Sequence, residues 1–183
     1  IIRIARLNAH HDAGIRGLTI DLVKQIIKLS HSLGTQVYIS AEIVLPEELE
    51  GYLLKINQNH IHHVMAFASL IISDSQSMSV ESAILGVPSI RFSDFAGKIS
   101  VLEELEHRYN LTVGVSPDQP DNLFQLMEQF LTNKAVPDEF RSRRLKMLSD
   151  KIDVSRFLLW FIENYPESVT IMRENPEYQY KFK

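Results

Sequence analysis

Cysteine is absent from the 183-residue sequence, so neither a disulfide framework nor a thiolate zinc site can form. This absence fits the cytoplasm, which is the expected location. No apolar run approaches the roughly 18 residues of a membrane span, and no basic segment with an apolar core opens the chain. Basic residues form only one short cluster, at 141–146, and the net charge is −4. A nucleic-acid partner is therefore not expected.

The order of predicted elements indicates a single α/β domain. With 183 residues, 45% of them hydrophobic, the chain can bury one core of ordinary size and is short for two. Strand-like runs alternate with helical patterns over 1–135, which favours a Rossmann-like, three-layer core with a parallel sheet of about five strands. Helices and a tail follow over 136–183. The predicted strands are 1–7, 36–40, 70–72, 89–92 and 112–115, and the predicted helices are 19–33, 46–56, 61–68, 78–85, 101–109, 121–131, 138–150 and 154–164.

A strand, a serine-rich turn and a helix follow one another in the segment LIISDSQSMSVESAILGVPSIRF, residues 70–92. In a parallel sheet this turn lies at the carboxyl end of its strand, where the first N–H groups of the helix suit a phosphate. Ser75, Gln76 and Ser77 add side-chain donors. Glu81 lies outside the capping-box position of a helix capped by Ser77, so we expect it to be available for a ligand hydroxyl. A well-capped helix after a core strand is the alternative.

The stretch DSQSMSVESAILGVP resembles the DSGG, EE and LGxP loop and helix of the non-hydrolysing UDP-N-acetylglucosamine 2-epimerases. It is also similar to the Ser-Gly, Glu and Gly-x-Pro segment of the lipid-II-forming N-acetylglucosaminyltransferase, and both enzymes have the GT-B fold. Nearly the whole chain resembles the C-terminal half of an uncharacterised bacterial and archaeal family, a domain of unknown function placed beside these enzymes. The resemblance implies a nucleotide-sugar-binding C-terminal half, with the N-terminal GT-B domain absent from this chain. It further implies that Ser75 to Ser77 hold a diphosphate and that Glu81 holds ribose hydroxyls.

The loop NAHHDAG after the first predicted strand lies at the same edge of the sheet as the serine-rich turn. Its histidines, His10 and His11, are candidate catalytic acid–base residues. In the 2-epimerases the corresponding strand ends in a similar Ala-His pair whose histidine belongs to the active site, and His10 matches it. His11, Asp12 and Gly14 stand where the epimerase has Arg, Arg and Asn, so the resemblance does not carry epimerase chemistry with it. A solvated loop in which Asp12 helps to start the next helix is the alternative.

The loop after the fourth predicted strand contains Gly97 and Lys98. In the related transferases this loop reaches the sugar or diphosphate, and a glycine followed by a lysine offers close backbone approach with a cation. An ordinary surface lysine is the alternative. No metal site is expected, because the spacing of His60, His62 and His63 points their side chains in different directions and no cysteine can complete a tetrahedral site.

The predicted helix 154–164 contains an unbroken apolar run over 157–162. Packing against a single face of the sheet cannot bury all of this apolar surface. A buried terminal helix is one interpretation. The other follows from the resemblance and from the abrupt start of the chain at Ile1, and it assigns part of this surface to contact with the missing N-terminal domain.

These observations predict the nucleoside-diphosphate-sugar-binding domain of a GT-B-type glycosyltransferase. No cofactor is expected, the substrate is a nucleotide sugar, by resemblance a UDP-sugar, and this fragment alone is expected to be inactive. A UDP-sugar 2-epimerase-like isomerase is one alternative, and a non-catalytic binding or scaffold domain is another. The sugar, the base, the acceptor and the oligomeric state stay open.

Overall fold

The computed structural model describes residues 1–7 and 14–183, which form two compact units, Ile1–Arg144 and Leu145–Lys183. The first unit contains a five-stranded sheet whose neighbouring strands all pair in parallel. The order across the sheet is β2-β1-β3-β4-β5. The predicted five-stranded parallel sheet is therefore confirmed. Its strands are β1 (Ile2–Ile4), β2 (Ile39–Ala41), β3 (Ile71–Ser73), β4 (Ser89–Phe92) and β5 (Val113–Val115).

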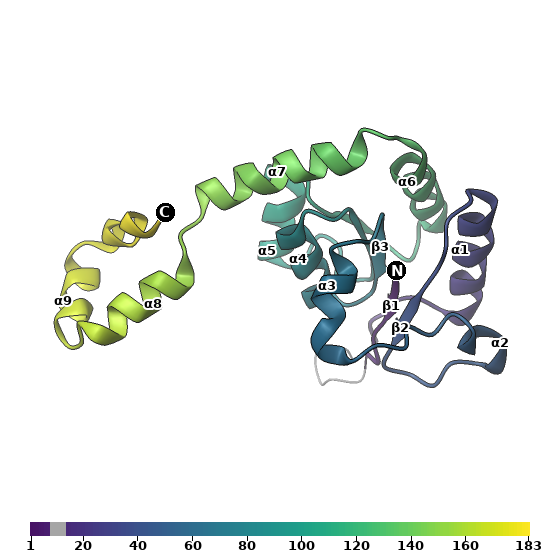
Figure 1. Cartoon of the computed structure of the whole chain (residues 1–183), viewed down its shortest axis with the longest axis horizontal. Helices are drawn as coiled ribbons and strands as arrows, with labels where there is room; N and C mark the ends of the chain where they lie inside the picture. The colour runs from purple at the N-terminus through teal and green to yellow at the C-terminus, as the bar shows by residue number, and fades with distance from the viewer. Residues whose placement is uncertain (8–13) are drawn as a thin grey trace. The chain divides into compact units, whose positions relative to one another are not determined.

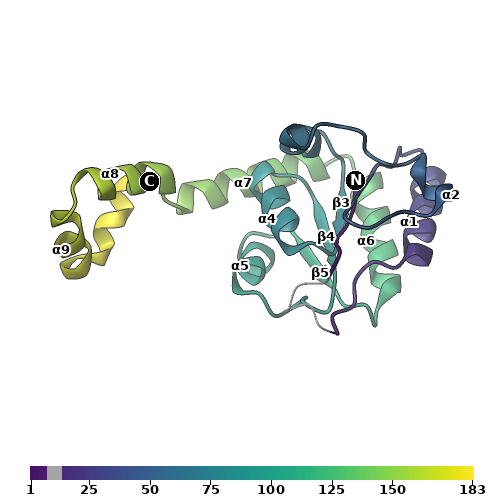
Figure 2. The ribbon, with the colours of Figure 1, turned by 90° about the horizontal axis from the view of Figure 1, so that it is seen from below.

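Helices cover both faces of this sheet and give the unit three layers (Figures 1 and 2). Buried aliphatic residues of α1 (Ile20–Ser32) and α6 (Pro120–Thr132) form one hydrophobic core with residues of all five strands. On the other face, α3 (Ile61–Met65) and α4 (Gln76–Leu85) form a smaller core with β3. The same face carries α5 (Ser100–Glu103) and the π-helical turn η3 (Glu104–Arg108). The expected Rossmann-like α/β class is confirmed by this arrangement.

Local signals explain where the two helices nearest the expected site begin and end. Thr19 caps α1, because its side chain accepts a hydrogen bond from the N–H of Leu22. Gly86 ends α4 with φ +74°, a left-handed conformation that glycine adopts without strain. The chain then enters β4 within three residues, so α4 packs back against the sheet it left.

The order of strands reverses between β1 and β3. After β1 the chain adds β2 on one side, and then it crosses to the other side of β1 to add β3, β4 and β5 in turn. The chain therefore adds its next strand on opposite sides of this point after β1 and after β3, and such a switch point is where open α/β sheets bind their ligands. The α4 turn follows β3 at this position.

The segment 46–56 differs from its predicted single helix, since only α2 (Glu47–Glu50) is helical. The N–H of Ile39 donates to the carbonyl of Tyr52, and the N–H of Leu54 donates to the carbonyl of Ile39. The backbone after α2 thus satisfies the polar groups at the outer edge of β2, which would otherwise be unpaired. A short turn, η2 (Gln58–His60), then leads into α3.

The helix α7 (Val136–Asp150) runs across the division between the units, and the second unit also contains α8 (Val154–Glu163), α9 (Glu167–Glu174) and η4 (Pro176–Phe182). The last two elements were not predicted. Aromatic rings hold η4 against α8, since Trp160 stacks on Tyr178 with centroids 4.7 Å apart and Phe157 meets Phe182 edge-on at 5.6 Å. The opposite side of α8 is open, with Ile162 71% exposed. Among the described residues, no helix is long and apolar enough to cross a membrane.

Candidate functional site

The N-terminus of α4 presents backbone donors at the switch point of the sheet. Ser73 shapes the turn, because its hydroxyl accepts from the N–H of Ser75 at 2.8 Å and donates to the Ser75 carbonyl at 3.2 Å. The Ser75 side chain, at the N-cap position, makes no capping hydrogen bond to the helix. The first-turn N–H groups of α4, which have no acceptor within the helix, are thus left without this usual side-chain acceptor. They are directed at the carboxyl edge of the sheet.

The three predicted donors of this turn lie in different environments. The hydroxyls of Ser75 and Ser77 are 3.3 Å apart, and Ser77 is exposed. The amide nitrogen of Gln76 donates to the carbonyl of Asp74 at 3.1 Å, so it braces the turn. Its buried oxygen Oε1 has no partner among the residues that the structure describes. Together the two serine hydroxyls and the helix N–H groups form a surface that matches an anion.

Glu81 lies one turn further along α4 and contacts His62, with 3.3 Å between Oε2 and Nε2. Both side chains are partly in solvent, 38% exposed for Glu81 and 59% for His62. The carboxylate makes no bond to the start of its own helix. A ligand hydroxyl can therefore reach Glu81 from the solvent side while His62 holds the other oxygen. No local sequence signal pairs His62 with this residue.

Asp74, which sequence reasoning did not select, follows β3 and binds the backbone after β1 and before α1. Its Oδ1 accepts from the N–H of Ala5 at 2.7 Å, and its Oδ2 accepts from the N–H of Leu18 at 3.0 Å. Burial raises the pKa of this carboxyl group. Gly17 permits the close approach, since a Cβ there would lie 2.6 Å from Oδ2. Asp74 therefore fixes both ends of the segment that leads from β1 to α1. The predicted acid–base residues His10 and His11 lie outside the described residues.

Arg16 ties three loops together at the same edge. Its guanidinium donates to both carboxylate oxygens of Asp94, at 2.8 and 3.0 Å, and to Asp118 at 2.7 Å. These bonds lower the pKa of Asp94 and the pKa of Asp118. The arginine follows β1, while its partners follow β4 and β5. This contact connects the loop after β4 to the start of the α1 segment.

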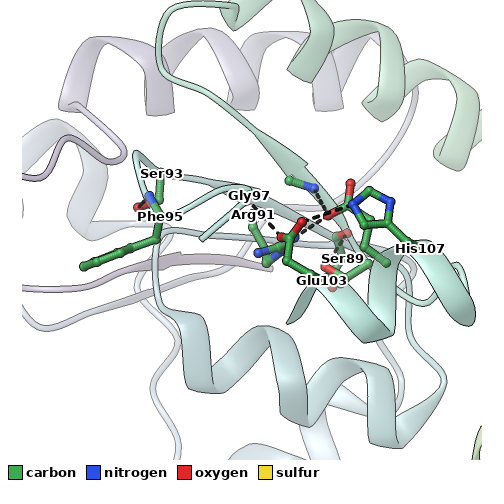
Figure 3. Close-up of polar contacts among 10 residues, drawn as sticks. Ser89, Arg91, Ser93, Phe95, Gly97, Glu103 and His107 are labelled. Carbon is green, nitrogen blue, oxygen red and sulfur yellow. Dashed lines mark hydrogen bonds and ion pairs between the residues drawn. The ribbon is translucent and has the colours of Figure 1, made fainter. Parts of the chain in front are cut away.

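The loop after β4 carries the predicted residues Gly97 and Lys98, both of which are exposed. The N–H of Gly97 donates to Glu103 at 3.1 Å, and Gly97 has φ +79°. Glu103 in turn accepts from Arg91, a fully buried residue of β4 (Figure 3). The Arg91 guanidinium also binds Glu106. A buried cation thus holds the backbone of this loop through one carboxylate. Lys98 is left at the surface, where it faces solvent beside the carboxyl edge.

A metal centre finds no support in the residues that the structure describes. Within 1–7 and 14–183, no group of three or more His, Asp or Glu side chains lies close enough to hold a metal ion. The rings of His60 and His63 lie 6.1 Å apart, and His62 is directed to Glu81 instead.

Solved structures with a similar fold include two glycosyltransferases. The glycosyltransferase of kitacinnamycin aligns over 78% of this chain and 38% of its own, with 12% identity and a TM-score of 0.50. CalG4, the calicheamicin glycosyltransferase, aligns over 81% of this chain and 38% of its own, with 19% identity and a TM-score of 0.52. No family model and no curated protein matches the sequence. The chain therefore has a fold found in GT-B glycosyltransferases and spans less than half the length of these two.

Proposed function

We propose that this chain is the C-terminal, nucleotide-sugar-binding domain of a GT-B-type glycosyltransferase, and that the start of α4 holds the diphosphate. The observation that carries the proposal is the position of that helix N-terminus, uncapped by Ser75, at the switch point between β1 and β3. The GT-B fold of two glycosyltransferases supports it. The resemblance of the α4 segment to the 2-epimerases and to the lipid-II-forming transferase adds the ligand class.

The residues suggest how such a site favours glycosyl transfer. As the bond between sugar and diphosphate breaks, negative charge grows on the leaving nucleoside diphosphate. Fixed N–H groups and the hydroxyls of Ser75 and Ser77 interact more strongly with that charge than with the intact substrate, so they stabilise the transition state. Glu81 accepts hydrogen bonds from the ribose, and Lys98 adds a cation from the loop after β4. His10 and His11 are the candidate acid–base residues of this chain, and the acceptor base comes mainly from the N-terminal domain.

Titration with nucleotides tests this proposal. UDP, GDP and dTDP are titrated into the chain by calorimetry, and amide shifts in NMR spectra locate the binding. We expect one of them to bind, with shifts at the α4 turn. The proposal would be contradicted if none of the three nucleotides bound at millimolar concentration, or if the amide shifts were confined to the amino edge of the sheet. Conversion of UDP-N-acetylglucosamine to its 2-epimer by the complete protein would favour the isomerase instead.

A charge placed in the α4 turn gives a sharper version of the test. Ser77→Asp adds a negative charge where the helix dipole favours it, so the helix keeps its stability while a diphosphate is repelled. Asn122→Asp adds the same charge to the first turn of α6, where no ligand is proposed. We expect the first variant to lose nucleotide affinity and the second to keep it. Equal affinities in the two variants would show that α4 does not hold the diphosphate.

A further inference from the structure

A cavity of about 590 Å³ lies beside the proposed diphosphate site, within the size range of small-molecule pockets. Its walls come from the ends of β1 and β2, from the segment between α2 and α3, and from the first turn of α4 through Met78. A group attached to a diphosphate at the start of α4 can therefore enter it. The polar lining residues that matter below are Arg3, Arg6, Ser40, Glu42 and Gln58.

The charged groups of this cavity do not balance. Arg3 forms an ion pair with Glu42 and donates to the hydroxyl of Ser40 at 2.8 Å. Glu42 also accepts from the backbone N–H of Arg6 at 3.1 Å, so the single carboxylate is engaged by both arginine residues. The guanidinium of Arg6 has no hydrogen-bond or ion-pair partner among the described residues. Among the described residues that line the cavity, one cation is therefore in excess.

Arg3 has unused donor capacity as well. Its Nε is buried and has no acceptor among the residues that the structure describes, although its side chain is 18% exposed. A buried donor without an acceptor destabilises the folded protein, and an acceptor brought by a ligand relieves that penalty. Two guanidinium groups with free donors on one cavity wall match the planar, paired oxygens of a carboxylate.

We propose that this cavity binds the carboxylate of an acidic sugar carried by the nucleotide, with Arg6 as the specificity-determining residue and Arg3 as its second donor. The inference rests on the proposed function, since the diphosphate on α4 is what brings the sugar to the cavity. A neutral sugar offers only hydroxyls and leaves Arg6 without a counter-charge. The ligand class is thus a nucleoside diphosphate uronic acid.

The test compares two nucleotide sugars that differ only at the sixth carbon. UDP-glucuronate and UDP-glucose, with UDP as reference, are titrated into the wild-type chain, Arg6→Gln and Arg141→Gln. The last variant is the matched control, because Arg141 is an exposed arginine of α7 that does not line the cavity. We expect the wild type and the control to bind UDP-glucuronate about fivefold more tightly than UDP-glucose, because one partly solvated charge-assisted hydrogen bond contributes a difference of this size. Arg6→Gln should remove the preference and leave UDP affinity unchanged.

Each other outcome overturns the inference in a distinct way. Equal affinities of the two nucleotide sugars in the wild type show that no carboxylate is recognised. An equal loss of UDP, UDP-glucose and UDP-glucuronate affinity in Arg6→Gln assigns the arginine to the diphosphate instead. A preference that persists in Arg6→Gln places the carboxylate elsewhere. If none of the three nucleotides binds, and GDP and dTDP also fail, the proposed function fails together with this inference.

Discussion

Replacement of Arg91 by methionine should destabilise the first unit strongly, because two carboxylates depend on this one cation. Arg91 is completely buried, whereas the side chains of Glu103 and Glu106 are 26% and 19% exposed. Removal of one partner of a buried ion pair costs about 3–5 kcal/mol, since the other charge stays behind uncompensated. The backbone N–H groups of Gly97 and Gly114 continue to donate to the two carboxylates. We therefore expect the lower end of the range, about 3 kcal/mol.

Thermal and urea unfolding followed by circular dichroism measure this loss. For a chain of this size, each kcal/mol lowers the melting temperature by about 2–4 °C, so Arg91→Met should melt about 6–12 °C below the wild type. Arg91→Lys keeps the charge but cannot hold two carboxylates in the same geometry, and it should fall in between. Arg141→Gln removes only an exposed ion pair with Asp138 and should shift the melting temperature by about 2 °C or less.

A second substitution separates lost packing from uncompensated charge. Glu106→Gln in the Arg91→Met background removes a carboxylate that has lost its cation, so it should restore part of the stability. An Arg91→Met variant that melts within about 2 °C of the wild type would refute the reasoning. A double variant no more stable than Arg91→Met would show that Glu106 did not need the cation.

Three further predictions concern the site and the second unit. Glu81→Gln should weaken nucleotide binding by about fivefold in calorimetry while the melting temperature hardly changes, because it removes the charge that strengthens bonds to ribose; a lower melting temperature with unchanged affinity would make Glu81 structural. Arg16→Gln should make the acid-induced loss of stability shallower, because Asp94 and Asp118 in the folded wild type have pKa values below their usual 3.8, and their stabilising contribution is lost as pH falls below that value. Unfolding curves at several pH values check this, and an unchanged slope would contradict it. The chain should self-associate at high concentration through the exposed side of α8, and Ile162→Glu should abolish the association in sedimentation experiments, whereas a monomeric wild type would contradict this prediction.

The order of strands and helices was predictable because the signals are local. Alternating apolar runs gave the five parallel strands, and Gly86 with its neighbours marked the end of α4. The helix predicted over 46–56 was wrong beyond Glu50, because the need of an edge strand for backbone hydrogen-bond partners overrode the local helix preference. The turn η4 was missed because its aromatic contacts with α8, rather than its own sequence pattern, stabilise it.

The polar contacts that shape the candidate site were harder to predict. Arg91 was recognised as part of a strand, but its burial depends on carboxylates 12 and 15 positions further along the chain. The partners of Arg16 lie 78 and 102 positions away. Asp74 was the exception among these residues, because an aspartate directly after a buried strand is a local signal that could have identified it as a site residue. The long-range contacts of Arg91 and Arg16 depend on which strands lie side by side in the sheet. A single sequence does not show which side chains this arrangement brings together.

The most direct test of the account is a crystal structure of the chain grown with saturating UDP. We expect the diphosphate oxygens to accept hydrogen bonds from the first-turn N–H groups of α4 and from the hydroxyls of Ser75 or Ser77, with the ribose beside Glu81. UDP bound instead at the amino edge of the sheet, where a second cavity of about 500 Å³ is lined by Ile1 and Phe67, would contradict it. So would an α4 turn without nucleotide under conditions where calorimetry shows the chain to be saturated.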